Sequence, residues 1–273
     1  MTVMPRVTSG WLELREGADA AARSAELFEL VLRSLAGTPS VVVHDLGCGT
    51  GSMGRWLAPR LPGPQRWVVH DRDAELLELA ASDPFILDGD GSPVTVETRW
   101  GDIAHLTAAD VAGASLVTAS ALLDLLTEAD VQRIATACAG AGCPALLTLS
   151  VSGRVDLTPA DPLDDVIASA FNAHQRRAVG ERELLGPDAV EVAVGAFEAW
   201  GMATTVRPSP WCLGAGDADL ITEWLSGWLA AAREQRPELA TPVEEYARRR
   251  RAEAARGALQ VVVHHDDLFA HRE

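Results

Sequence analysis

A short glycine-rich stretch holds the residues whose types and spacing point most directly to chemistry. Residues 41–54 read VVVHDLGCGTGSMG, in which an apolar run ends in Asp45 and is followed by Gly47, Gly49 and Gly51. Glycines this dense allow a backbone to approach a ligand where a Cβ atom would clash. An acidic residue at the end of the run suits a cationic partner, such as an α-ammonium group, better than a pyrophosphate. The stretch therefore predicts a ligand-binding turn.

The spacing of these glycines separates the turn from two common nucleotide-binding motifs. A dinucleotide fingerprint reads G-x-G-x-x-G, whereas the sixth position here is Ser52. A P-loop ends in G-K-[ST], and this chain has no lysine, because all 23 of its Lys and Arg residues are arginine. The turn instead follows the pattern D-x-G-x-G-x-G.

Two further acidic residues follow apolar runs later in the chain. Asp71 ends the run WVVHD, and Asp102 lies in the stretch WGDI. A carboxylate at the end of the second strand of such a unit can accept hydrogen bonds from both hydroxyls of a ribose. Asp102 could accept a hydrogen from the amino group of adenine. The pattern predicts an adenosine-like ligand.

The elements that must position these residues alternate between apolar strands and amphipathic helices. The strand pattern occurs at 41–45, 66–71, 93–100, 114–120 and 144–151, and the helix pattern at 18–36, 73–82 and 127–140. Such alternation predicts a doubly wound α/β sheet, in which ligands bind beyond the carboxyl ends of the strands. Further elements are expected at 160–181 (helical), 187–201 (helix), 203–210 (strand), 216–234 and 242–256 (helices) and 258–270 (strand).

The stretches VVVHDLGCGTG, WVVHDRDAELLELA, RWGDI and ASLVTASALLDLL together resemble the class I S-adenosylmethionine-dependent methyltransferases, in their small-molecule branch. The resemblance covers about residues 38–151. It implies a mostly parallel, seven-stranded α/β sheet whose last strand is reversed, with helical insertions forming a lid. The single domain, 1–273, would comprise a helical cover (1–37), a cofactor-binding core (38–151) and insertions around an acceptor site (152–186 and 211–256).

The resemblance also implies roles for individual residues. The cofactor would be S-adenosyl-L-methionine, converted to S-adenosyl-L-homocysteine, and its methionine moiety would be framed by Asp45, Gly47, Gly49 and Gly51. Asp71 would hold the ribose with Arg72 beside it, Asp102 and Ile103 would contact adenine, and Ser120 would lie beneath the sulfonium. In related folds the N-terminal helix covers the cofactor, so Arg23 could pair with its carboxylate, although Arg15, Asp19 and Arg23 could equally form a solvated ladder.

No catalytic residue is evident, and methyl transfer does not demand one, because alignment in a dry pocket supplies much of the catalysis. The candidates for a base are His174 and His105, and a solvated or structural histidine is the alternative at both positions. Asp124 could face the pocket or lie on a helix face. The stretch TASALLDL lacks the acid- or asparagine-Pro-Pro-aromatic motif of enzymes that methylate amino nitrogens of bases and amides. We therefore expect O- or N-methylation of a small molecule, with hydroxyl acceptors slightly ahead.

The charge and cysteine content of the chain limit the kinds of partner and metal site to be expected. The formal net charge of −16 repels phosphate backbones and anionic lipid, so we expect neither nucleic acid nor a membrane as a partner. The four cysteines show no metal-ligand spacing, so we expect no metal and a reduced, cytoplasmic protein. The run YARRRRAEAAR, 246–256, is interpreted as an exposed helix with salt bridges to Glu244 and Glu245. The oligomeric state stays open.

Two other functions remain open. A protein of the same fold could bind S-adenosylmethionine or S-adenosylhomocysteine without transferring a methyl group. A nicotinamide-dependent oxidoreductase is a further alternative, which the glycine spacing disfavours. If the protein has the methyltransferase fold, a group of aromatic residues could cover an apolar acceptor or could simply be part of the core. These residues are Trp211, Trp224, Trp228, Phe171 and Phe197.

Overall fold

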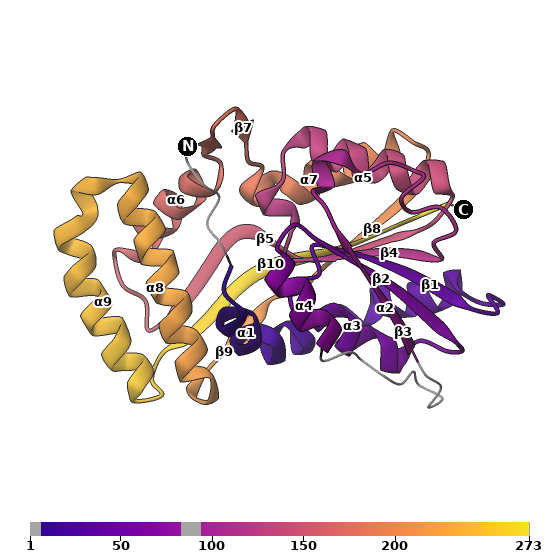
Figure 1. The fold of residues 1–273 in the computed structure, drawn as a ribbon. Helices are drawn as coiled ribbons and strands as arrows, with labels where there is room; N and C mark the ends of the chain where they lie inside the picture. Colours follow the sequence, from indigo (N-terminus) through magenta and orange to yellow (C-terminus); the bar gives the residue numbers. More distant parts are fainter. Residues whose placement is uncertain (1–6, 83–93, 273) are drawn as a thin grey trace.

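A mostly parallel β-sheet forms the centre of the molecule (Figure 1). The computed structural model describes residues 7–82 and 94–272. Within them the strand order is β3-β2-β1-β4-β5-β10-β8, with β9 paired to β10. Strands β1 to β5 run parallel, whereas β10 is antiparallel to β5, β8 and β9. The strands are β1 Val41–Leu46, β2 Gln65–Asp71, β3 Val94–Trp100, β4 Leu116–Ser120, β5 Ala145–Thr158, β8 Ala203–Pro208, β9 Trp211–Leu213 and β10 Gln260–His271. This arrangement confirms the predicted sheet.

Helices cover both faces of the sheet. One face packs against α2 (Ala25–Ser34), α3 (Ser52–Leu57) and α4 (Ala74–Ser82), and the other against α5 (Glu128–Ala141) and α7 (Ala189–Glu198) (Figure 1). A capping box begins α5: Thr127 accepts a hydrogen bond from the backbone of Asp130, whose carboxylate accepts one in return. Two apolar clusters result, one on each face, so the sheet is buried on both sides as a doubly wound fold requires.

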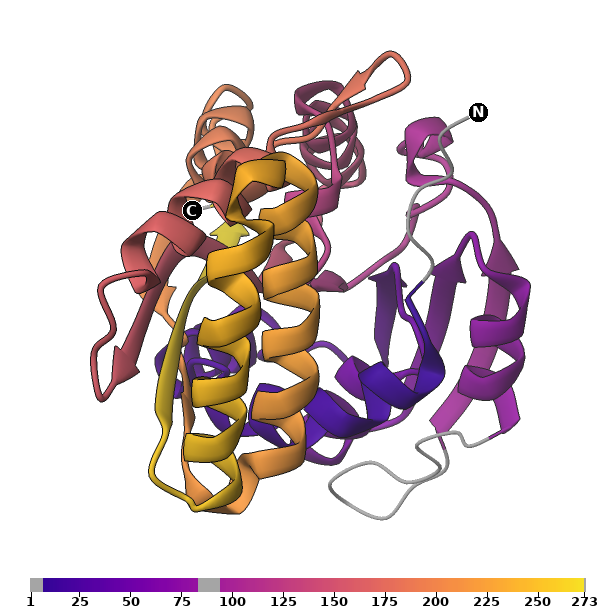
Figure 2. The same ribbon diagram turned by 90° about the vertical axis from the view of Figure 1, so that its left-hand side faces the viewer.

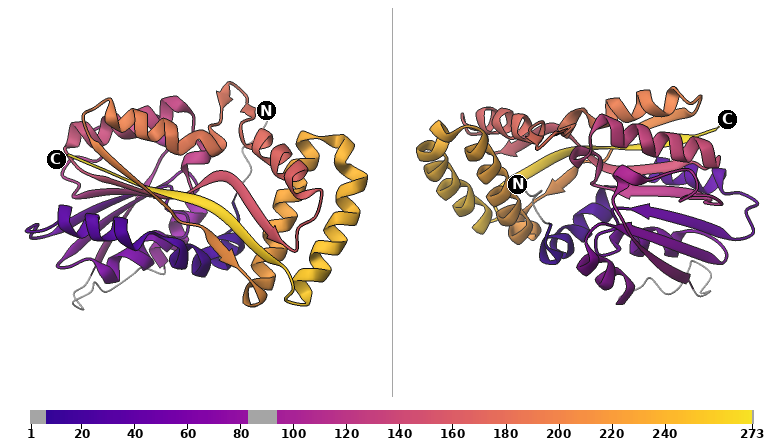
Figure 3. Two further views of the ribbon diagram at one scale, coloured as in Figure 1. Left: turned by 180° about the vertical axis from the view of Figure 1, so that it is seen from behind. Right: turned by 45° about the horizontal axis from the view of Figure 1, so that its top comes forward.

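A second layer of helices is carried by the outer halves of the two longest strands. Beyond the rest of the sheet, β5 and β10 continue side by side and support α6 (Asp164–Gln175), α8 (Ala218–Gln235) and α9 (Ala240–Ala255) (Figures 2 and 3). These three helices and the strand extensions are called the lid below. The lid has its own apolar cluster, which includes Trp211 and Trp228. A small hairpin, β6 Ala178–Val179 and β7 Arg182–Glu183, follows α6.

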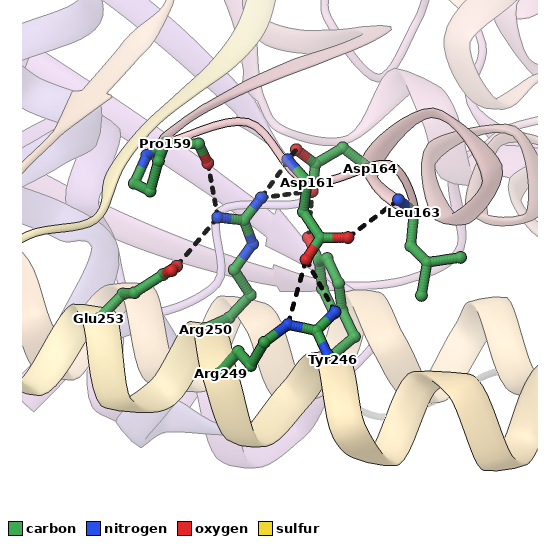
Figure 4. A network of polar contacts seen from close by, with 8 residues as sticks. All are labelled: Pro159, Asp161, Leu163, Asp164, Tyr246, Arg249, Arg250 and Glu253. Carbon is green, nitrogen blue, oxygen red and sulfur yellow. Dashed lines mark hydrogen bonds and ion pairs between the residues drawn. The ribbon is translucent and has the colours of Figure 1, made fainter.

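A buried arginine joins α9 to the start of α6 and to the segment before it (Figure 4). The side chain of Arg250 is 1% exposed and donates to both carboxylate oxygens of Asp164, at 2.6 and 2.7 Å. It also donates to the carbonyl of Pro159 and to Glu253. The interpretation of this arginine run as an exposed helix with salt bridges is therefore wrong at Arg250, because this arginine turns inward to meet a carboxylate that is distant in the sequence.

The N-terminal segment departs from the sequence prediction of one helix over 18–36. The chain forms α1 (Ser9–Ala22) and α2, and breaks between them at Arg23, whose ψ of 136° is extended. Ser24 then caps α2 by accepting a hydrogen bond from the backbone of Leu27. Helix α1 packs against β9 and α8, across the carboxyl ends of the parallel strands. The break matters because it directs Arg23 into the protein.

The tryptophans proposed as a roof are core residues of the lid. Trp224 and Trp228 stack at 5.0 Å between ring centroids, and Trp228 also contacts Tyr246. Phe197 lies in a different cluster, under α5 and α7, so the five aromatic residues do not form one surface. In the part of the chain that the structure describes, no helix combines the length and apolar character needed to cross a membrane.

Candidate functional site

The glycine turn connects β1 to α3 with backbone conformations that favour glycine. Gly47 and Gly49 have φ values of 65° and 55°. A Cβ atom added to Gly47 would lie 2.9 Å from the side chain of Leu122, and one added to Gly49 would lie 3.0 Å from Leu12. The turn is thus covered closely by α1 and by the loop that follows β4.

Asp45, at the end of β1, is a buried carboxylate with an unused oxygen. It is 1% exposed, and its Oδ1 accepts a hydrogen bond of 2.7 Å from the hydroxyl of Thr118. Its Oδ2 is buried without a hydrogen-bond partner. Burial raises the pKa of Asp45 to about 7, against the lowering effects of the Thr118 hydroxyl and the charge of Arg23. An ionised Asp45 would therefore be stabilised by any cation that reached Oδ2.

Arg23, in the break between α1 and α2, is the matching buried cation. It is 5% exposed, donates from Nη2 to the hydroxyl of Ser120 at 3.1 Å, and lies 5.1 Å from the ring centroid of Trp56. Its Nε and Nη1 are buried without hydrogen-bond partners. Burial lowers the pKa of Arg23, although the charges of Asp19, Asp267 and Asp45 oppose this. Asp19 and Arg23 are buried and Arg15 is half-buried, so the interpretation of these residues as a solvated ladder is wrong.

Arg23 and Asp45 influence each other electrostatically but do not form an ion pair within 4 Å among the described residues. Each keeps polar atoms that neither protein nor solvent satisfies. Buried polar groups of this kind are costly unless something pairs with them. A ligand with a carboxylate for Arg23 and an ammonium group for Asp45 would satisfy both. The geometry at the strand ends is thus complementary to an α-amino acid.

Asp71, at the end of β2, is tied to the same turn. Its Oδ2 accepts a hydrogen bond of 2.9 Å from the backbone N–H of Gly49, and its Oδ1 accepts one of 2.9 Å from the N–H of Asp73. Each carboxylate oxygen has two acceptor sites, so Asp71 can still accept from two ligand hydroxyls. The neighbouring Arg72 is exposed, and its carbonyl accepts a hydrogen bond from the indole of Trp100.

The residues expected near adenine lie at the outer rim. Asp102 is exposed and caps a short turn by accepting from the N–H of Ala104. Ile103 is half-buried against the core beneath α5, and His105 is exposed. The structure therefore places Asp102 and Ile103 beyond β3, while among the described residues no hydrogen bond or ion pair orients the His105 side chain as a base.

The loop after β4 carries the groups that lie beside Ser120. Ala121 has a φ of 51°, which turns the chain so that Leu122 covers Gly47. Asp124 follows, and its Oδ2 accepts a hydrogen bond of 3.3 Å from the amide nitrogen of Gln175 in α6. Asp124 is thus part of a polar contact between this loop and the lid, rather than an isolated acid on a helix face.

His174, the other candidate base, is engaged within the lid. Its Nε2 lies 3.2 Å from a carboxylate oxygen of Glu234 in α8, and its Nδ1 lies 3.1 Å from Arg177. Burial and the charge of Arg177 lower its pKa. Its neighbour Gln175, not His174, reaches the loop after β4. The sequence pattern of this helix could not show which of the two neighbours, His174 or Gln175, contacts that loop.

Asp267 in β10 is a structural residue of the site that the sequence analysis missed. Its carboxylate accepts hydrogen bonds from the N–H of Ser24 and of Leu149, both 2.8 Å, and from the hydroxyl of Ser209 at 2.6 Å. It thereby fixes the break that presents Arg23. The acidic pair Asp266 and Asp267 at the end of the apolar run VVVHHDD, residues 261–267, could have indicated this role, because an acid inside a buried strand needs several hydrogen-bond donors.

A hollow elsewhere on the molecule lacks the unpartnered polar atoms of the site. This open hollow of about 700 Å³ lies between β5 and α6, and two of its charged lining residues, Arg154 and Asp156, pair with each other. Its lining includes no residue of the glycine turn and none of the unpartnered buried atoms described above. Within the described ranges, no three histidine, cysteine or acidic side chains converge as a metal site would require.

Comparison with solved structures agrees with the topology. The cyclopropane synthase MmaA2 from Mycobacterium tuberculosis has a TM-score of 0.51 at 12% sequence identity, covering 97% of this chain and 94% of that chain. Coclaurine N-methyltransferase bound to N-methylheliamine and SAH has a TM-score of 0.47 at 12% identity, covering 97% and 79%. A SAM-dependent methyltransferase from Geobacter sulfurreducens in complex with S-adenosyl-L-homocysteine has a TM-score of 0.44 at 16% identity, covering 99% and 98%.

No protein-family model and no curated protein matches the sequence. At these identities the likeness concerns the fold and not the reaction. The chain has the fold of the class I S-adenosylmethionine-dependent methyltransferases.

Proposed function

We propose that this protein binds S-adenosyl-L-methionine at the glycine turn and transfers its methyl group to a small-molecule acceptor. One observation carries the proposal: Arg23 and Asp45 are buried, opposite in charge and incompletely partnered beside the turn. They fit the carboxylate and ammonium groups of the methionyl moiety. Asp71 fits the ribose hydroxyls, and Asp102 and Ile103 would border the adenine.

The cofactor supplies an activated methyl group on its sulfonium when it is bound. The chain's own contribution is to position that ligand and to exclude water. Gly47 and Gly49 allow backbone approach, Ser120 lies at the end of β4 beside Arg23, and α1 covers the turn through Leu12. Because the unpartnered atoms are inaccessible to solvent, α1 has to move for a ligand to enter.

The charge of the protein supports a small-molecule acceptor rather than a nucleic acid. A net charge of −16 at neutral pH opposes binding of a phosphate backbone and favours neutral or cationic ligands. The lid, which includes the carboxyl half of β5 and contacts the loop after β4 through Gln175, is the part of the molecule proposed to enclose the acceptor. A cytoplasmic location belongs to the same proposal.

The first test is thermal unfolding with S-adenosylmethionine, S-adenosylhomocysteine and NADH added separately. A ligand present at a hundred times its Kd stabilises the native state by about 2.7 kcal/mol, which raises Tm by several degrees in a chain of this size. We expect both sulfur ligands to raise Tm and NADH to leave it unchanged. Stabilisation by NADH alone would support an oxidoreductase and would overturn the proposal.

Replacement of Asp71 tests the ribose contact. The variant Asp71→Asn keeps an acceptor for the N–H of Gly49 but loses the charge and one acceptor oxygen. We expect it to weaken S-adenosylhomocysteine binding by about 1–3 kcal/mol, since one ligand hydroxyl loses its partner. Isothermal titration calorimetry measures the change. Glu97→Gln, on the exposed part of β3, is the matched control and should bind as the native protein does.

The raised pKa of Asp45 predicts a pH dependence of cofactor binding. Asp45 must be ionised to pair with the ligand ammonium group, and burial places its pKa near 7 in the free protein. Below pH 7 binding must therefore expel a proton, and Kd should rise by up to about tenfold per pH unit. Above about pH 8 the ligand's α-amino group loses its charge and affinity falls again. Cofactor affinity measured by calorimetry from pH 5 to 9 should be highest between about pH 7 and pH 8. In Asp45→Asn the fall in affinity below pH 7 should be absent.

A further inference from the structure

We propose that Asp124 and Gln175 form the acceptor subsite, and that the acceptor is an amine rather than an alcohol. This inference rests on the proposed function, because it assigns the substrate class of the same site. Asp124 lies on the loop after β4, four residues beyond Ser120, and Gln175 ends α6 of the lid. The two side chains meet where the core faces the lid.

Their hydrogen bond determines which atoms remain available. The amide nitrogen of Gln175 donates to Oδ2 of Asp124, because a carboxylate can only accept. The amide oxygen of Gln175 is consequently left as an acceptor, and it is buried without a partner. A ligand entering here meets two kinds of acceptor oxygen, one from the amide and one from the carboxylate. An ammonium group or a primary amine offers enough N–H donors for both, whereas a hydroxyl offers one.

The charges around Asp124 also favour an amine. Arg15 of α1 is the charged side chain that acts on Asp124, and its guanidinium is already held by Asp19 through bonds of 2.9 to 3.2 Å. Asp19 is held in turn by the indole N–H of Trp211. Within the described chain, no ion pair joins Arg15 to Asp124. The Asp124 carboxylate therefore has no cation of its own, and an ammonium group would supply one.

Asp124 is also suited to take a proton. Burial raises its pKa to about 6, with the charge of Arg15 and the Gln175 hydrogen bond opposing the shift. A bound ammonium group gives one proton to the carboxylate, and the freed lone pair forms the N–C bond as the S–C bond breaks. The S–C electron pair stays on sulfur, the product leaves as a secondary ammonium ion, and Asp124 returns its proton to solvent. Atoms and charge balance without a further reactant.

The experiment uses pairs of compounds with one carbon skeleton: benzylamine and benzyl alcohol, phenethylamine and 2-phenylethanol, cyclohexylamine and cyclohexanol. Binding to the protein saturated with S-adenosylhomocysteine is measured by calorimetry, and methyl transfer by release of S-adenosylhomocysteine. We expect the amines to bind and to be methylated in preference to the alcohols. The variants Asp124→Asn and Gln175→Leu should lower amine affinity and kcat/KM by about thirtyfold or more.

Three controls separate the possible causes. Asp165→Asn removes an exposed carboxylate from the same lid helix and should leave amine binding unchanged. The Kd for S-adenosylhomocysteine should be the same in Asp124→Asn as in the native chain, which also shows that the variant is folded. Three outcomes would overturn the proposed subsite. The protein could prefer the alcohols, it could bind none of the amines, or Asp124→Asn could bind the amines as tightly as the native protein does. Loss of cofactor binding in the native protein would instead overturn the proposed function.

Discussion

Replacing Arg23 with methionine is expected to weaken S-adenosylhomocysteine binding by about 100-fold or more while leaving the free protein folded. A guanidinium–carboxylate contact in a buried site contributes charge-assisted hydrogen bonds of about 1.5–3 kcal/mol each. Arg23 has two nitrogen atoms free for such bonds, Nε and Nη1. Loss of both corresponds to roughly 3–4 kcal/mol or more, which is two to three orders of magnitude in Kd.

The same substitution should have little effect on Tm in the absence of ligand. Burial lowers the pKa of Arg23, so its surroundings oppose the charge more than they support it. Methionine removes that cost and keeps an apolar stem against Trp56. The expected result is therefore a large loss of affinity with a shift of only a few degrees in Tm, measured by calorimetry and thermal unfolding.

Arg60 provides a matched control for this experiment. Its guanidinium lies 5.1 Å from the same Trp56 ring as that of Arg23, but it belongs to the turn after α3 and donates to the Trp56 carbonyl. Arg60→Met removes an arginine stacked on the same indole and should bind S-adenosylhomocysteine like the native protein. Equal losses in both variants would mean that Trp56 packing, and not ligand pairing, explains the effect of Arg23.

Much of the fold could be predicted because its signals are local. The strands β1 and β2 contain short apolar runs, which is what strands covered on both faces require, and each run is followed by a histidine and an acid. The glycine turn and the capping box of α5 are equally short patterns. Parallel strands bring their carboxyl ends together, so Asp45, Asp71 and Ser120 could be assigned to one rim without any knowledge of tertiary contacts.

The parts that were missed depend on contacts between distant segments. The alanine-rich pattern continues through Arg23, so the helix break was hidden, although Ser24 before a helical run is a usual cap signal. Gln175 meets Asp124 across 51 residues, and Asp267 meets Ser24 across 243. Neither separation leaves a trace in local periodicity. The pairing of β9 with β10 was hidden for the same reason.

The inward position of Arg250 belongs to this second group, and its replacement should have the largest effect on stability. Arg250→Met is expected to lower the free energy of unfolding by about 3–5 kcal/mol, because it leaves the Asp164 carboxylate buried without its cation. The hydroxyl of Tyr246 and the backbone N–H of Asp161 would still donate to that carboxylate, but neither carries a positive charge. Urea unfolding followed by tryptophan fluorescence measures the loss, since Trp228 packs against Tyr246 in the same cluster.

Arg249 is the adjacent control on the same helix. Its side chain is 44% exposed and pairs with Asp161 at 2.7 Å, so Arg249→Met should cost at most about 1 kcal/mol. In Arg250→Met the substitution Asp164→Asn should restore part of the stability, because it removes the stranded charge. Similar losses in the two arginine variants, or no recovery in the double variant, would contradict the interpretation of a buried ion pair. At a temperature where Arg250→Met is folded, its affinity for S-adenosylhomocysteine should be native, because the contacts of Arg250 lie wholly within the lid and its connection to β5.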